Sequence, residues 1–145
     1  MQNLLRGKIY NGELLEAVEL SYKIEIPELE GLLMEWAFEE PSMIIYTFIC
    51  RRLEKAESDE LHSLAADILC HPLCHLEGAY LSSFYHAQEC VRLAPENVSY
   101  REFLLFFAEI PEKLLDKKIA LKLAADILQE NPSSQAAKTF MKENR

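Results

Sequence analysis

Glycine and proline are both scarce in this chain, which has four glycines and six prolines among 145 residues. Folds with many tight turns, such as β-sandwiches and β-barrels, need more of both. Basic residues are also few, because 15 lysines and arginines stand against 24 acids and the formal net charge is −9. Nucleic acid is therefore disfavoured as a partner, since a protein needs a basic face to neutralise phosphates.

Long apolar runs are absent as well. The longest uncharged apolar runs, residues 43–50 and 103–108, fall far short of the roughly 20 residues that a membrane-spanning helix needs. The first residues contain neither the apolar segment of a signal peptide nor a small-residue cleavage site. We therefore expect a cytoplasmic protein with no membrane partner, in which the four cysteines are reduced thiols and form no disulfides.

Apolar residues make up half of the chain, and they recur at helical spacing. Leu61, Leu64 and Ile68, for example, share one helical face, and the six prolines stand between such segments or at their starts. The segment 43–50, MIIYTFIC, has the composition of a strand, but no turn separates it from the helical residues 51–55. The expected helices are 12–23, 27–39, 42–56, 59–70, 73–93, 97–108, 111–130 and 133–143. Ser58 or Asp59, and Ser133 or Ser134, are the expected N-terminal caps of two of them.

One helical sequence occurs twice. The six residues LAADIL at 64–69 recur letter for letter at 123–128, which is 59 residues later, and each copy precedes a proline. Two similar amphipathic helices would explain the identity. A helical repeat array, in which each helix pair buries its face on its neighbours, would also explain it and is the interpretation that we favour.

Two segments resemble the second helix and exit turn of a tetratricopeptide repeat: HAQECVRLAPEN at 86–97 and ALKLAADILQENP at 120–132. Small residues, Ser83 and Ala120, stand twelve positions before each proline, where the second helix of that family packs closely on the first. The family's Trp, Leu-Gly and Tyr signature in the first helix is missing. The resemblance covers roughly residues 73–143 and implies helical hairpins that stack on one another.

These patterns predict a single all-α domain over residues 1–145. We expect seven to eight helices, stacked as antiparallel hairpins in a solenoid. Acidic helices would occupy residues 1–60, and tetratricopeptide-like helices would occupy residues 61–145.

Sulfur and imidazole side chains gather between residues 62 and 90, which contain all four histidines and three of the four cysteines. Zinc prefers such ligands, and a set of four can be drawn from this region: Cys74, His75, His86 and Cys90. Neither C-x-x-C nor H-E-x-x-H is present, and reduced cysteine is an ordinary core residue. We expect core cysteines, helix-end histidines and no cofactor, with a zinc-binding regulatory protein as the alternative.

Catalytic motifs are absent too. The chain has no glycine-rich phosphate loop, no G-x-S-x-G elbow and no S-x-x-K pair. Paired carboxylates such as Glu39 and Glu40 stand at expected helix ends, where acids are common. A general acid needs a buried site that raises its pKa, and no pattern marks one. We therefore expect a protein that is not an enzyme.

Negative charge is concentrated in one stretch. Residues 13–40 contain nine acids and one base, a local charge of −8, around the only tryptophan of the chain. Such a stretch can be a solvated helical face, or a docking surface for a basic protein, since acidic fields speed encounter with basic partners and tryptophan often anchors interfaces. The candidate contact residues are Glu16, Glu19, Glu28, Glu35, Trp36 and Glu39.

The function that we expect is non-catalytic protein binding with a basic protein partner. The small size, the acidity and the missing signal peptide favour an inhibitor, such as an immunity protein that neutralises a basic toxin or nuclease. An adaptor or chaperone that holds a peptide on a concave helical surface is the other version of the same function.

Overall fold

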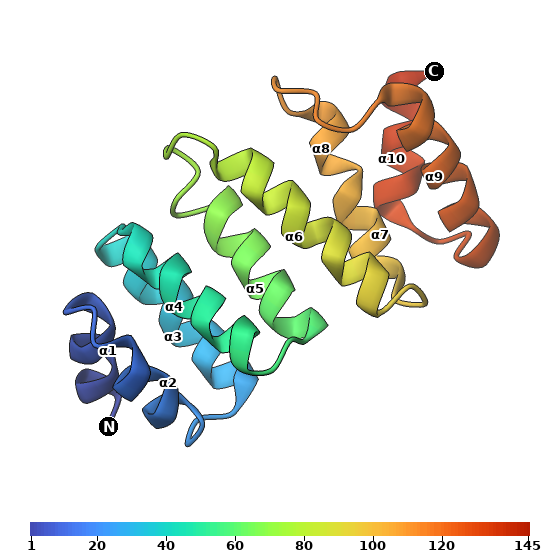
Figure 1. Cartoon of the computed structure of the whole chain (residues 1–145). Helices are drawn as coiled ribbons and strands as arrows, with labels where there is room; N and C mark the ends of the chain where they lie inside the picture. Colours follow the sequence, from blue (N-terminus) through green and yellow to red (C-terminus); the bar gives the residue numbers. More distant parts are fainter. The chain divides into compact units, whose positions relative to one another are not determined.

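The computed structural model describes all of residues 1–145 and contains helices and turns but no strand (Figure 1). The predicted all-α class is therefore confirmed. The chain divides into two compact units, unit 1 over residues 1–83 and unit 2 over residues 84–145. Helix α6 (Ala79–Leu93) contains the boundary between them. None of the helices combines the length and the apolar character that crossing a membrane requires.

Unit 1 contains five complete helices, which surround one apolar core. Helix α4 packs against α1, α2 and α5, and α3 packs against α5. The core consists mainly of large side chains, among them Leu5, Leu33, Trp36, Phe48 and Ile68. The helices are α1 (Gln2–Tyr10), α2 (Leu14–Ser21), α3 (Ile26–Glu39), α4 (Met43–Lys55) and α5 (Asp59–Cys70).

Local sequence signals account for several helix starts in unit 1. Ser42 Oγ accepts a hydrogen bond from the Ile44 amide at 3.3 Å, and Ser58 Oγ accepts one from the Leu61 amide at 3.1 Å. The predicted cap at Ser58 is confirmed. The strand-like segment 43–50 is helical, as we expected, and it supplies fully buried side chains to the core. Intrinsic propensity is a weak guide for such a segment, and its continuity with the helical residues 51–55 places it in α4.

Unit 2 contains four further helices around a smaller core. Helix α9 packs against α10 and α7. Ser134 Oγ accepts a hydrogen bond from the Ala137 amide, which confirms the predicted cap at Ser134. The core is rich in alanine and includes Ala120, Ala124, Ile127 and Phe140. The helices are α7 (Val98–Leu104), α8 (Phe106–Glu109), α9 (Lys117–Glu130) and α10 (Gln135–Asn144).

The structure has ten helical segments, more than the seven to eight that we expected. Helix α1 was not expected. Residues 71–78 form turns that end at Gly78, with φ +81°, so α6 begins at 79 instead of 73. Residues 111–116 also turn, and α9 begins only after Asp116, whose carboxylate accepts the Lys118 amide at 3.0 Å. The boundary between the two compact units follows residue 83.

Candidate functional site

The two units differ sharply in charge. Residues 1–83 contain 15 of the 24 acids and six of the 15 bases, whereas residues 84–145 contain nine acids and nine bases. The net charge of −9 therefore belongs entirely to unit 1. Such an imbalance produces a negative potential around one part of the molecule and leaves the other part without a net field.

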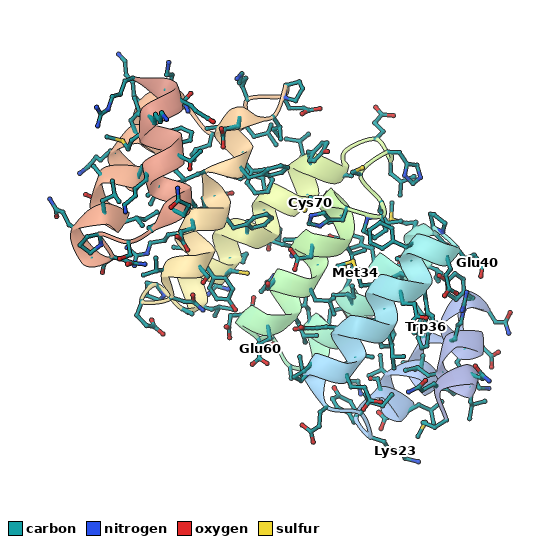
Figure 2. The ribbon with its side chains drawn as sticks, turned by 180° about the vertical axis from the view of Figure 1, so that it is seen from behind. Lys23, Met34, Trp36, Glu40, Glu60 and Cys70 are labelled. Atoms are coloured by element: carbon teal, nitrogen blue, oxygen red, sulfur yellow. The ribbon has the colours of Figure 1, made fainter.

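The nine acids of residues 13–40 lie on α2, on α3 and beside these helices. Eight of them are exposed, and only Glu30 is half-buried. Glu28, Glu35 and Glu39 recur at i, i+7 and i+11, so they share one face of α3. In Figure 2, Glu40 and Lys23 lie toward the outside of unit 1, while Trp36 lies among its helices.

Bases from outside this stretch pair with the acids of α2. Lys8 Nζ lies 2.8 Å from a carboxylate oxygen of Glu13 and 2.9 Å from one of Glu16. The hydrogen bond from Lys8 lowers the pKa of Glu13 below its usual range. Lys55 Nζ lies 3.7 Å from Glu19. The sequence did not predict these pairs, which means that part of the local charge is neutralised within the unit.

Some acids of α3 and the adjoining residue also form ion pairs or hydrogen bonds with α1. Arg6 of α1 lies 2.9 Å from Glu39 and 3.6 Å from Glu40, and the Gln2 amide donates to Glu28 at 3.2 Å. All of these carboxylates remain solvent-exposed. Exposed ion pairs are worth about 0–1 kcal/mol each, so a partner's basic side chain can replace the internal one at little cost.

The remaining acids of the stretch have no basic partner. Glu25 and Glu35 are exposed and make no ion pair. Burial raises the pKa of Glu30, and the negative charges of Glu60 and Asp67 raise it further. Uncompensated negative charge is therefore strongest along α3 and the neighbouring face of α5.

Trp36 is a core residue and only 5% exposed. The Arg6 guanidinium lies over its ring at 5.8 Å from the centroid, and the Tyr10 hydroxyl donates to its carbonyl at 3.1 Å. The indole therefore packs inside unit 1. Apolar side chains that do face solvent in this stretch are Leu15, Tyr22 and Phe38.

Leu15 borders a shallow groove of about 420 Å³ on α2. Its side chain is 65% exposed. The groove is lined by Leu15, Glu16, Glu19, Leu20 and Lys23. It combines two leucines with two carboxylates, so it suits an apolar side chain that is flanked by bases.

The cysteines form no disulfide. Cys70 and Cys90 are buried, whereas Cys50 and Cys74 are half-buried. Burial raises the pKa of the Cys70 thiol to about 11. A thiol with this pKa is protonated at neutral pH and is not an activated nucleophile.

The four zinc ligands considered from the sequence are divided between the two units. Cys74 and His75 belong to unit 1, in the turns after α5, while His86 and Cys90 belong to unit 2, on α6. Within unit 1 a different group comes together at the end of α5: Asp67, Cys70 and His71. The sequence contained its signal, because residues at i, i+3 and i+4 share a helical face.

Comparison with known proteins identifies no relative. No protein-family model, no curated protein and no solved structure matches the chain. The resemblance to tetratricopeptide repeats therefore stays a prediction.

Proposed function

We propose that the protein is a non-catalytic, protein-binding helical module whose unit 1 docks a basic protein. The main evidence for this proposal is that residues 1–83 have a net charge of −9, whereas residues 84–145 have no net charge. Exposed charges act over about 8 Å at physiological salt. The acidic field of unit 1 therefore speeds encounter with a basic partner and attracts it to this unit.

The proposed docking surface, called the acidic surface below, consists of exposed acids on α2 and α3: Glu16, Glu19, Glu28, Glu35 and Glu39. The apolar contact within it is Leu15, which is exposed beside the groove on α2. Trp36, an interface candidate in the sequence, has no place on this surface because its side chain packs in the core.

The version of this function that we favour is a cytoplasmic inhibitor, such as an immunity protein that neutralises a basic toxin or nuclease. Enzymes that act on nucleic acids need basic surfaces, and an acidic protein of this size can cover such a surface. The adaptor version requires a concave surface from stacked antiparallel hairpins, which is the finer arrangement that the tetratricopeptide resemblance implies.

The first experiment identifies the partner and measures the role of charge. The tagged protein is used to capture proteins from an extract of its host at low salt, and the captured partner is purified. Binding is then titrated at two salt concentrations with the wild type and with the variant Glu28→Lys, Glu35→Lys, Glu39→Lys. We expect a basic partner, slower association and a weaker salt dependence for the variant.

A charge reversal in unit 2 provides the matched control. Glu96→Lys, Glu112→Lys and Glu143→Lys change three exposed acids of unit 2 with the same sign and amount of charge. They should slow association less than the α3 variant does. Unchanged affinity and salt dependence in the α3 variant, with normal folding, would show that the acidic surface only solvates the protein. Stoichiometric loss of the partner's own enzymatic activity separates the inhibitor from the adaptor.

A further inference from the structure

The last turn of α5 brings together three side chains of the kinds that bind metals. One ligand atom from each of Asp67, Cys70 and His71 lies within 4.8 Å of the others. Cys70 Sγ and His71 Nδ1 are 3.3 Å apart. Figure 2 shows Cys70 at this end of the helix. The group lies wholly within unit 1 and has no part in the acidic surface.

We propose that Asp67, Cys70 and His71 bind one zinc ion, with water as the fourth ligand. Zinc lies about 2.3 Å from sulfur and about 2.0 Å from nitrogen, so a tetrahedral site places these two atoms about 3.5 Å apart. The separation of 3.3 Å already approaches that distance. A thiolate and an imidazole select zinc over magnesium or calcium, which prefer sites made of oxygen ligands.

The electrostatics of this end of α5 favour a cation. Asp67 is half-buried and makes no ion pair with a lysine or arginine. Glu30 and Glu60 add negative charge close by, since the pKa of Glu30 is raised by both Glu60 and Asp67. A bound divalent cation would offset this repulsion directly.

The protons of the group can adjust to the ion. His71 Nδ1 lies 2.9 Å from the Asp67 carbonyl oxygen, so its proton is donated there in the metal-free protein. The ring is exposed, so when the proton moves to Nε2 the imidazole can turn away from this carbonyl oxygen and present the Nδ1 lone pair to zinc. The Asp67 carbonyl keeps the backbone N–H of His71 as a donor at 3.1 Å.

Zinc binding also displaces the proton of the Cys70 thiol, and the sulfur then binds the ion as a thiolate. The histidine proton moves from Nδ1 to Nε2 and stays on the ring, so one proton is released for each zinc ion bound. The affinity for zinc should therefore increase as the pH rises. The site is independent of the proposed docking of a basic protein, because the two use different residues.

Cobalt and zinc are the probes for the test. The reduced, metal-free full chain is titrated with Co²⁺ and then with Zn²⁺. We expect one equivalent of Co²⁺ to produce a thiolate-to-cobalt charge-transfer band, which Zn²⁺ removes by displacement. Asp67→Asn and His71→Ala should each weaken zinc affinity by about tenfold or more, and Cys70→Ser should abolish the band.

Matched controls come from the same unit. Cys50→Ser and His75→Ala remove a thiol and an imidazole outside the group, and both should keep wild-type affinity. Circular dichroism checks that each variant is folded. If Cys70→Ser fails to fold, Asp67→Asn and His71→Ala decide the question, since their side chains are less buried. Absence of the band in the wild type, or equal losses in the controls, would overturn the site.

Discussion

Unit 1 and unit 2 are both helical, but they are stabilised by different side chains. Three of the sixteen buried residues in the core of unit 1 are alanines, against four of the seven in the core of unit 2. Larger side chains remove more apolar area from water, at about 25 cal/mol per Å². The unit that carries the repulsive charge of −9 is therefore also the one with the larger core.

The units also differ in how they accommodate an arginine that is largely shielded from solvent. Arg52 in unit 1 is 6% exposed and has no acidic partner; it donates to Ser21 Oγ at 2.8 Å and lies over the Tyr22 ring. Arg101 in unit 2 forms an ion pair with Glu130. Burying a charge without an acid is costly, whereas a paired charge recovers part of that cost.

The largest expected effect on stability comes from truncating a large buried side chain in either core. Phe48→Ala in unit 1 and Phe140→Ala in unit 2 each remove a buried ring and should lower the free energy of unfolding by about 3–5 kcal/mol. Amide hydrogen exchange should show lost protection mainly in the unit that carries the substitution. Equal loss along the whole chain would show that the two units unfold together, and the comparison between them would then fail.

The two arginines should respond differently to replacement by methionine. Arg52→Met removes a buried charge that has no acid partner, so the stability should stay the same or rise by up to about 1 kcal/mol. Arg101→Met breaks a pair whose acid is half exposed and should cost about 1 kcal/mol. Urea denaturation of both variants measures the difference. A large loss in Arg52→Met would mean that its bond to Ser21 and its contact with Tyr22 outweigh the burial cost.

Neutralising a carboxyl whose pKa is raised should increase the stability by a smaller amount that depends on pH. Burial raises the pKa of Glu30 in unit 1 and of Glu109 in unit 2. Each ionised carboxylate destabilises the folded state above that raised pKa, and the effect disappears below the unfolded value of about 4.3.

Glu30→Gln should therefore stabilise the protein by a few tenths of a kcal/mol at pH 7 and by nothing near pH 3.5. Glu109→Gln should increase the stability by less, because Glu109 is exposed whereas Glu30 is half-buried, even though the negative charge of Glu143 also raises the pKa of Glu109. Urea denaturation at the two pH values is the measurement. An equal gain at both pH values would exclude ionisation as the cause.

The smallest expected effect is a difference in stability between substitutions of two acids of the acidic surface. Glu35→Lys changes an acid with no ion pair and should alter the stability by less than about 0.5 kcal/mol. Glu39→Lys also breaks the pair with Arg6 and should cost up to about 1 kcal/mol. Thermal unfolding at low and high salt compares them, and high salt should bring the two values together. Identical values at low salt would mean that the Arg6 pair contributes nothing.

Local patterns predicted the helices best where the signal lay in neighbouring residues. The caps at Ser58 and Ser134 and the helical conformation of 43–50 follow from sequence neighbours alone, and the structure confirms all three. Helix α1 was missed because its stability depends on distant residues. Only two of its side chains, Leu5 and Ile9, are buried, and both enter the core that the other helices of unit 1 form.

The candidate sites also combine features that follow from neighbouring residues with features that depend on distant ones. Helical spacing alone places Glu28, Glu35 and Glu39 on one face, and it also aligns Asp67, Cys70 and His71. Spacing does not say which distant side chain a residue meets. The sequence therefore offered Trp36 as an interface anchor, and only the packing of α3 shows that it is buried.

The sequence by itself determined the helical class and the amount and position of the charge, because helix periodicity and charge are properties of neighbouring residues. The tertiary structure alone decided which acids are neutralised, as when Arg6 reaches Glu39, which is 33 residues away. It also decided that Cys74 and Cys90, two of the zinc ligands considered from the sequence, belong to different units. Both outcomes depend on the packing of helices far apart in the chain, which periodicity does not encode.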